Sequence, residues 1–271
     1  MPELPEAETI VGGLAPHLVG ARIARVRLSR PDVVHDGRST LTRALRGRIV
    51  QTIHRRGKRI ALSFSPHGSL VFALGMSGRL TLATVDQPVP KHTHLRLVFD
   101  NDAELRFCDP RRFGGIWFFN RPQSDGQPPP LRLGPEPLVI TLSHFRSLVR
   151  RRRQIKALLL DQHALAGLGN IYCDEALHRA RIHPQRRSED LNDAEVGALW
   201  RAIRNVLRAA IRAGGSTISD FRSADGSEGY FQISHRVYGR AGQPCRTCRT
   251  PIETQITAGR TTHFCPTCQH S

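Results

Sequence analysis

The last part of the chain holds four cysteines whose spacing is typical of metal ligands. They form two Cys-x2-Cys pairs separated by sixteen residues: Cys245, Cys248, Cys265 and Cys268. Two tight turns of this kind present four thiolates as a tetrahedron, which is the geometry of a structural zinc site; two redox pairs are the alternative interpretation. Four thiolates leave no open position for a substrate. The predicted Zn²⁺ is therefore structural, and it supplies folding energy to a segment too short to bury its own core.

The residues between the cysteine pairs favour a β-hairpin. Its strands are expected at 253–258 and 261–264, with Gly259 and Arg260 at the turn. Arg260 at such a tip is a natural phosphate contact, and the alternative is a solvated turn residue.

A second group capable of chemistry lies at the other end of the chain, where Pro2 is followed by Glu3 and Glu6. Removal of Met1 exposes the secondary amine of Pro2. An α-amino group has a reference pKa of about 8, so more of it is neutral at pH 7 than of a lysine. A neutral secondary amine can attack an aldehydic carbon to form an iminium ion, and a neighbouring carboxylic acid can protonate the ring oxygen of a sugar. The alternative is that both glutamates only complement the dipole at the start of a helix.

The charge balance indicates a polyanionic partner. The chain has 40 Lys and Arg against 23 Asp and Glu, a formal net charge of +17. Basic surfaces bind nucleic acids by displacing condensed counterions, and an anionic membrane is the competing interpretation. No apolar run approaches the roughly 20 residues that span a bilayer, and the acidic N-terminus lacks the features of a signal peptide. We expect a cytoplasmic, nucleic-acid-binding protein without a membrane partner.

Hydrophobic periodicity predicts the elements that position these residues. Apolar residues at helical spacing predict a helix over 3–18, with Pro5 tolerated in its first turn. Short runs with period two then predict an antiparallel sandwich or barrel; they begin at Ile60, Leu70, Leu95 and Leu105.

The second half of the chain has a helical pattern. The Pro-rich stretch at 127–130 is expected to connect two domains. The clearest helix starts near Asn192, where a capping box with Glu195 is predicted, and it stops at Gly214 and Gly215. Residues 215–235 are expected to form a long polar loop, and loops of that length are often functional.

Six sequence blocks occur in one order along the chain: 1–9 (MPELPEAET), 56–58 (RGK), 74–78 (LGMSG), 109–114 (DPRRFG), 133–138 (LGPEPL) and 167–172 (GLGNIY). Together with the four-cysteine tail, they resemble the bacterial formamidopyrimidine-DNA glycosylases (Fpg or MutM) of the Fpg/endonuclease VIII family. The resemblance covers essentially the whole chain.

This resemblance implies a catalytic set. The family's proline nucleophile corresponds to Pro2, its acid to Glu3, a second active-site carboxylate to Glu6 and a catalytic lysine to Lys58, while Arg260 completes the set. Taken from the residues alone, Lys58 is equally well one charge of a basic cluster.

The resemblance also implies residues that bind DNA around an extruded base. Extrusion costs a few kcal/mol, which an inserted wedge can offset. Met76, Arg111 and Phe113 match the residues that fill the vacated space; the alternative for Met76 and Phe113 is a place in the core. Neighbouring glycines favour exposed turns instead.

In the second domain the resemblance implies a helix–two-turn–helix, with helices at 155–160 and 170–180. Asn170 is expected to be both an N-cap and a phosphate ligand, Lys156 a phosphate-binding lysine, and His92 a backbone contact or a surface histidine. The loop at 217–238 corresponds to a lid over the extruded base.

We therefore expect a two-domain α+β fold. It comprises an antiparallel β-sandwich with an N-terminal helix over 1–133, a helical DNA-binding domain over 134–240 and a zinc hairpin over 241–271. The implied function is a bifunctional glycosylase and AP lyase that excises 8-oxoguanine opposite C and formamidopyrimidines from duplex DNA containing oxidised bases or abasic sites. A monomer in the bacterial cytoplasm, associated with the nucleoid, is expected. An endonuclease VIII-like enzyme for oxidised pyrimidines and a non-catalytic DNA-binding protein are the competitors; Leu4 and the DPRRFG block favour the purine-directed branch.

Overall fold

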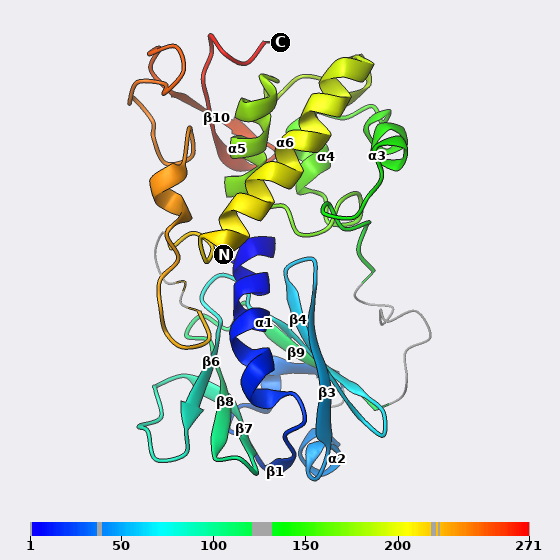
Figure 1. Ribbon diagram of the computed structural model, residues 1–271, viewed down its shortest axis with the longest axis vertical. Helices are drawn as coiled ribbons and strands as arrows, with labels where there is room; N and C mark the ends of the chain where they lie inside the picture. Colours follow the sequence, from blue (N-terminus) through cyan, green and yellow to red (C-terminus); the bar gives the residue numbers. More distant parts are fainter. Residues whose placement is uncertain (1, 37–39, 121–131, 218–220, 222, 271) are drawn as a thin grey trace. The chain divides into compact units, whose positions relative to one another are not determined.

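The chain forms two compact units, shown in Figure 1. The computed structural model describes residues 2–36, 40–120, 132–217, 221 and 223–270. The first unit combines Met1–Arg132 with Ala213–Tyr230, and the second combines Leu133–Arg212 with Phe231–Ser271. The loop expected at 217–238 is thus divided between the units, although the sequence prediction placed it in the helical domain. The Pro-rich stretch at 127–130 lies outside the described residues.

The first unit contains mostly strands. Its elements are α1 (Leu4–Leu18), β1 (Ile23–Leu28), the 3₁₀ helix η1 (Pro31–Val33), β2 (Val34–Asp36), α2 (Leu41–Leu45), β3 (Ile49–Arg56), β4 (Arg59–Ser65), β5 (Ser69–Ala73), β6 (Arg79–Thr84), β7 (Thr93–Phe99), β8 (Ala103–Cys108) and β9 (Gly115–Phe119).

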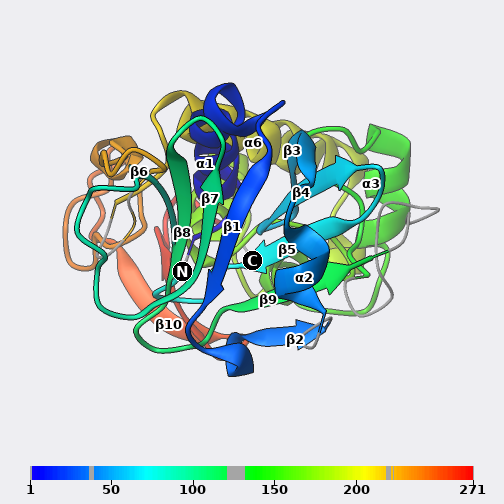
Figure 2. The ribbon, with the colours of Figure 1, turned by 90° about the horizontal axis from the view of Figure 1, so that it is seen from below.

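These strands build two sheets that share one core, and the view in Figure 2 separates them. One sheet has the order β1-β7-β8-β6, and the other has the order β2-β9-β5-β4-β3. Alternate side chains of both sheets enter the same apolar cluster, where the rings of Phe72 and Phe107 lie 5.7 Å apart. The predicted antiparallel sandwich is confirmed with one difference. The short edge strand β2 runs parallel to β9.

Helix α1 covers part of this core because its apolar residues fall on one stripe. Ala7, Ile10, Leu14 and Leu18 are each at most 1% exposed. Burial of one leucine side chain contributes about 1.5–3 kcal/mol, so this stripe fixes the helix on the sandwich. The predicted helix over 3–18 is confirmed, with Glu3 as its N-cap residue.

The second unit contains mostly helices. Its elements are α3 (Leu142–Val149), α4 (Ile155–Leu160), α5 (Asn170–Ala180), the 3₁₀ helix η3 (Ser188–Asp190), α6 (Asp193–Arg212), the 3₁₀ helix η4 (Phe231–Ser234), β10 (Glu253–Thr257) and β11 (Arg260–Phe264).

Helix α6 begins at the predicted capping box. The backbone N–H of Glu195 donates to the Asn192 side chain at 2.9 Å, and the backbone N–H of Asn192 donates to the Glu195 carboxylate at 2.8 Å. The helix stops before Gly214 and Gly215, both of which have positive φ. Its apolar stripe packs against α5, which also packs against β11.

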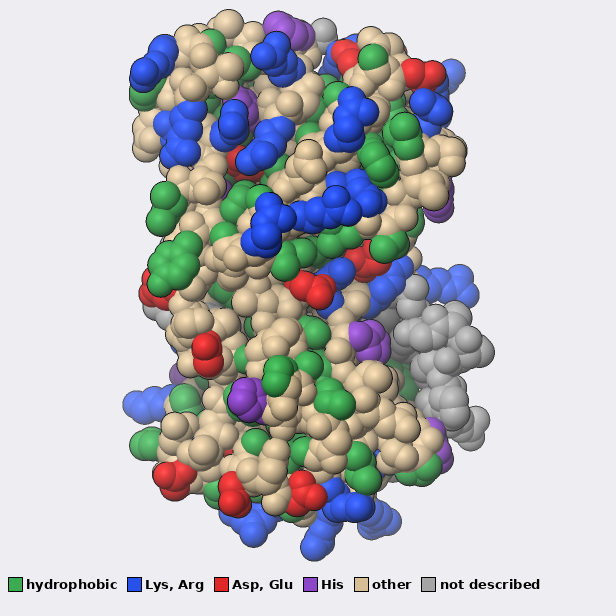
Figure 3. Space-filling model, viewed as in Figure 1, with side chains coloured by type: hydrophobic (Ala, Val, Ile, Leu, Met, Phe, Trp, Pro, Cys, Tyr) green, Lys and Arg blue, Asp and Glu red, His purple; other side chains and the backbone are tan. Residues whose placement is uncertain are grey.

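The described helices contain no segment that is both long and apolar enough to cross a bilayer. Lys and Arg side chains are frequent over the part of the second unit that holds α6, on the face drawn in Figure 3. On this helix the side chains of Arg201, Arg208 and Arg212 are exposed.

Candidate active site and zinc site

The start of α1 holds two buried carboxylates directly after Pro2, which is itself buried. Glu3 is 3% exposed and Glu6 is 2% exposed. The Glu6 carboxylate accepts the backbone N–H of Glu3 at 2.8 Å and, with its other oxygen, the backbone N–H of Ser216 at 2.8 Å. Three of the predicted catalytic residues, Pro2, Glu3 and Glu6, therefore lie together. Glu6 is also hydrogen-bonded to Ser216, which directly precedes the predicted lid.

Lys58 lies on the tight turn between β3 and β4. Gly57 has a φ of +59°, a conformation that glycine adopts without strain. Arg55 holds this turn, because its guanidinium donates to the Gly57 carbonyl at 3.0 Å and to the Glu8 carboxylate of α1 at 2.6 Å. The half-buried Lys58 is thereby tied to the helix that begins beside Pro2.

The predicted wedge residues lie on two loops, one after β5 and one after β8. Met76 is 46% exposed and Phe113 is 59% exposed, so the prediction of exposed turns is confirmed and a place in the core is excluded. The guanidinium of Arg111 lies over the Phe113 ring, 4.6 Å from its centroid. His92, another predicted site residue, is exposed directly before β7 and has a φ of +64°.

The buried carboxylate of Asp109 joins these two loops, a role that the sequence did not reveal. It accepts the Ser77 hydroxyl at 2.6 Å and the backbone N–H of Gly114 at 2.7 Å. The Ser77 oxygen in turn accepts the backbone N–H of Arg111 at 3.2 Å. The one available signal was an aspartate directly before a proline, a pattern typical of turns.

The loops also approach each other through glycine. A Cβ on Gly75 would lie 2.6 Å from the carbonyl oxygen of Phe113, closer than such atoms come. The two glycine-containing blocks therefore pack backbone to backbone, which holds the loop of Met76 against the loop of Phe113.

In the second unit, the two predicted helices have the expected bounds, but Asn170 is not the N-cap. Gly169 takes that place, and Asn170 is the first helical residue. Its side-chain amide donates to the backbone carbonyl of Thr261 at 2.7 Å. The amide therefore faces β11 rather than the backbone of its own first turn.

Lys156 was expected to meet a phosphate, yet its side chain is fully buried. The ammonium group donates to the Asp174 carboxylate at 2.6 Å and to the Thr262 hydroxyl at 2.7 Å. The burial of Lys156 follows from its position on helix α4. Lys156 lies on the inward face of α4 with Ile155 and Leu159, and a buried charge needs these partners.

Arg260 is exposed, but it is the first residue of β11 and not a turn residue as predicted. Ala258 and Gly259 make the turn, and both have positive φ. The hairpin itself is confirmed, with Thr257 paired to Arg260 and Glu253 to Phe264.

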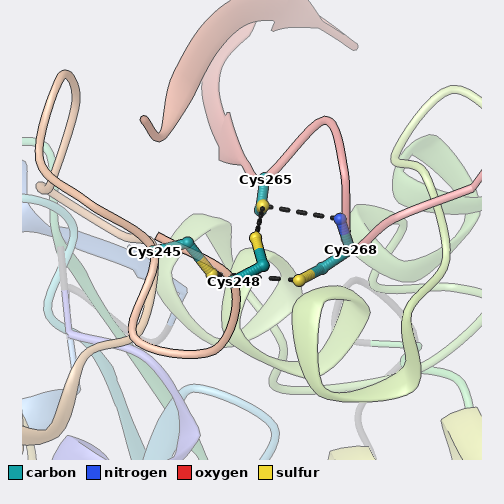
Figure 4. Close-up of side chains that lie close together, drawn as sticks. All are labelled: Cys245, Cys248, Cys265 and Cys268. Atoms are coloured by element: carbon teal, nitrogen blue, oxygen red, sulfur yellow. Dashed lines mark hydrogen bonds between the residues drawn. The ribbon is translucent and has the colours of Figure 1, made fainter. Parts of the chain in front are cut away.

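The four tail cysteines converge, as Figure 4 shows. Their Sγ atoms all lie within 4.8 Å of one another, with 3.4 Å between Cys248 and Cys265 and 3.9 Å between Cys245 and Cys268. Thiolates bound tetrahedrally to zinc at about 2.3 Å lie about 3.8 Å apart, so this donor set fits the ion.

Hydrogen bonds and burial shift the pKa values of these thiols in opposite directions. The Thr250 hydroxyl and backbone N–H lower the pKa of Cys248 to about 6, whereas burial raises the pKa of Cys268. Backbone N–H groups of Thr247 and Cys268 point to Cys245 and Cys265, each at 3.4 Å. These donors stabilise negative charge on sulfur, which a dication needs in its ligands.

Three family models match the chain in order. They are described as "Formamidopyrimidine-DNA glycosylase N-terminal domain" at residues 1–116, "Formamidopyrimidine-DNA glycosylase H2TH domain" at 133–222 and "Zinc finger found in FPG and IleRS" at 242–270. A formamidopyrimidine-DNA glycosylase of Solibacter usitatus (strain Ellin6076) is 46% identical over 272 residues, 99% of each chain.

The chain belongs to the formamidopyrimidine-DNA glycosylase family. Solved structures agree. A glycine-to-proline variant of Lactococcus lactis FPG in complex with a Fapy-dG containing DNA has a TM-score of 0.92 at 37% identity, with 100% of both chains covered. MutM in complex with carbocyclic 8-oxo-G containing DNA has a TM-score of 0.90 at 37% identity, with the same coverage.

For this member of the formamidopyrimidine-DNA glycosylase family, the matched zinc-finger model and the geometry of the four cysteines both indicate zinc. Cys245, Cys248, Cys265 and Cys268 hold one structural Zn²⁺. The bound ion supplies folding energy to the segment around β10 and β11, which buries little apolar surface of its own.

Proposed function

We propose that this chain is a bifunctional DNA glycosylase and AP lyase that excises oxidised purines, 8-oxoguanine opposite C and formamidopyrimidines, in base excision repair. The observation that carries the proposal is the pair of buried carboxylates that follows Pro2 at the start of α1. The DNA complexes of its relatives, which carry Fapy-dG and carbocyclic 8-oxo-G, support this substrate class.

In the proposed reaction, the nitrogen of Pro2 attacks C1′ of the damaged nucleotide once Met1 is removed. The bond from C1′ to the base breaks, and the base leaves with its electron pair and takes up a proton. Glu3 is the acid that protonates the sugar ring oxygen as the ring opens, which leaves a Schiff base between Pro2 and C1′.

The Schiff base then acts as an electron sink for two eliminations. Loss of a proton from C2′ expels the 3′ phosphate, and a second elimination expels the 5′ phosphate. The second elimination takes a proton from C4′, and water then hydrolyses the remaining Schiff base to release the unsaturated sugar fragment from Pro2. The DNA product is a one-nucleotide gap with phosphates at both ends. Lys58 and Arg260 are the cations proposed to assist these proton transfers or to bind the adjacent phosphates. Lys58 is half-buried on the turn between β3 and β4, and Arg260 is exposed at the start of β11.

Glu6 is assigned a different part in this scheme. Both of its oxygens accept backbone N–H groups, so it is suited to hold the backbone at Glu3 and Ser216 in place. Burial strengthens such bonds, and the nucleophile then approaches C1′ with little freedom to rotate away.

DNA contacts are proposed for the remaining site residues. The exposed Met76, Arg111 and Phe113 are suited to fill the space of an extruded base, and His92 to contact the backbone. Asn170 uses one amide N–H for Thr261, and because an amide carries two, the second can reach a phosphate. Lys156 is considered separately below.

Borohydride trapping tests the proposal. The processed, zinc-loaded protein is incubated with a duplex that carries 8-oxoguanine opposite cytosine, and sodium borohydride reduces any Schiff base to a stable covalent adduct. We expect an adduct that is lost in Pro2→Gly. Protein that retains Met1, identified by mass spectrometry, is the matched control and should not be trapped.

The competing functions give different outcomes. Preferential trapping on thymine glycol assigns the chain to the pyrimidine-directed, endonuclease VIII-like branch. DNA binding without an adduct on any oxidised duplex or abasic site contradicts the enzymatic proposal and leaves a non-catalytic DNA-binding protein.

A further inference from the structure

Lys156 and Asp174 form an ion pair with no exposure of either side chain. Removing two charges from water costs several kcal/mol per ion, and the attraction between them often does no more than offset this cost. Such a pair is weak evidence for stability by itself. Its other hydrogen bonds indicate what the pair does.

Two further bonds of the pair's side chains lead to strand β11, and Asn170 adds a third, so that three consecutive residues of the strand are held. Asn170 donates to the carbonyl of Thr261, Lys156 donates to the hydroxyl of Thr262 at 2.7 Å, and the backbone N–H of His263 donates to Asp174 at 2.9 Å. The start of β11 is therefore fixed to α4 and α5 through both side chains and backbone.

The chain of bonds continues to Arg260. The Thr262 hydroxyl accepts from Lys156 and donates to the backbone carbonyl of Arg260 at 3.1 Å. One hydroxyl has one proton to donate and lone pairs to accept, so both bonds can form at once. The backbone of Arg260 is thus one hydroxyl group away from the buried ammonium.

Zinc holds the other end of the same strand. Cys265 directly follows β11, five residues after Arg260. At about 3.3 Å per residue, the metal ligand and Arg260 are about 16 Å apart along the strand. The zinc site alone therefore leaves the tip of the hairpin free to bend, and the Lys156–Asp174 pair constrains the part that the metal does not reach.

We infer that Lys156 and Asp174 are positioning residues that hold Arg260 in place through Thr262, and that Lys156 does not itself contact a phosphate. This inference rests on the proposed function in one respect, namely that Arg260 acts on DNA. It assigns to a buried pair the role of setting where an exposed cation meets the nucleic acid.

The most selective variant is Thr262→Val, which removes only the hydroxyl and leaves the ion pair intact. We expect one zinc per chain, as in the unchanged protein, and faster hydrogen exchange at the backbone amides from Arg260 to His263. Incision of the lesion duplex should fall by the same factor as in Arg260→Ala. Thr254→Val, an exposed threonine on the partner strand β10, is the matched control and should change neither readout.

A double-mutant cycle tests the route through Arg260. In the Arg260→Ala background, Thr262→Val should change incision by less than about threefold, because residues that act through one group are not additive. Multiplicative losses would overturn the inference. Lys156→Met combined with Asp174→Asn, which neutralises both members of the buried pair, should behave like Thr262→Val if the protein folds.

The salt dependence of binding decides whether Lys156 touches phosphate. Each phosphate contact contributes about one unit to the slope of log K against log salt. Lys156→Met with Asp174→Asn in the Arg260→Ala background should leave that slope unchanged, and a further loss of about one unit would show direct contact. Hydrogen exchange and binding require no catalysis, so they decide this inference even if no Schiff base can be trapped.

Discussion

The Glu6 carboxylate accepts the backbone N–H of Ser216 at 2.8 Å, a bond between residues 210 positions apart in the chain. Its other oxygen accepts the backbone N–H of Glu3. One buried side chain therefore connects the backbone at the proposed nucleophile to the base of the proposed lid, and both lie in the first unit.

Glu6→Gln should weaken this connection. A glutamine has one acceptor oxygen, and its amino group cannot accept the second backbone N–H. A buried donor left without a partner costs about 1–3 kcal/mol of unfolding free energy. We expect the unfolding free energy measured in urea to fall by that amount, and we expect slower borohydride trapping. An unchanged trapping rate would show that neither bond matters for approach of the nucleophile. His17→Gln, on the exposed side of α1, is the control.

Gly215→Ala should disturb the same bond from the other side. The residue has a φ of +82°, and a Cβ would lie 2.9 Å from the Glu6 Oε1 atom, so strain and a steric clash add. Gly20→Ala is the matched control, because its φ is +86° and nothing lies within 4 Å of the added Cβ. We expect the Gly215 variant to lose more unfolding free energy than the Gly20 variant, measured in urea. Equal losses would mean that backbone strain alone accounts for both.

Local patterns predicted the elements of this fold well. The stripe of α1, the capping box of α6 and the hairpin between the cysteine pairs all depend on residues a few positions apart, which interact within one element. The zinc ligands follow the same logic, since each Cys-x2-Cys turn places two thiolates by local geometry alone.

The contacts that the sequence did not reveal join distant parts of the chain. Lys156 meets Thr262, 106 residues away, and this bond decides that a lysine resembling a phosphate ligand is buried. Asp109 and Ser77 are 32 residues apart. A single sequence does not show which distant residues pair in space, so it predicted candidate site residues but not the contacts that hold them in position.

Ser77→Ala should loosen the two wedge loops. The hydroxyl donates to Asp109 and accepts from the backbone of Arg111, and its loss leaves a buried carboxylate with one bond fewer. We expect a decrease of about 1–3 kcal/mol in unfolding free energy and weaker base extrusion. A 2-aminopurine placed opposite the lesion reports extrusion by its fluorescence. Ser29→Ala, an exposed serine, should stay within about 0.5 kcal/mol, and similar values for both variants would contradict the proposed link.

Asp225 should titrate well below an ordinary aspartate. Hydrogen bonds from the Ser223 hydroxyl and from the backbone N–H of Ser227 lower its pKa from 3.8 to about 2. Because the folded pKa is depressed, the turn is fully stabilised above pH 4, and the stabilisation is lost as the pH falls through about 2. The amide chemical shift of Ser227 should show a midpoint near pH 2 that is absent in Asp225→Asn. A midpoint near 3.8 would mean that the turn does not form in solution.

Removal of zinc should unfold the hairpin before the rest of the chain. The segment around β10 and β11 has a small apolar cluster built largely from the ligands themselves, so the metal supplies most of its folding energy. We expect one zinc per chain, release of that zinc by a chelator, and loss of the hairpin's hydrogen bonds near the ligands, measured as rapid amide exchange in β10 and at Phe264, while the β-sandwich core stays protected. Cys248→Ser should give the same pattern without a chelator. Cys108→Ser, a cysteine outside the cluster, should keep both zinc and protection. Retained protection of β10 after the zinc is gone would show that the hairpin folds without the metal.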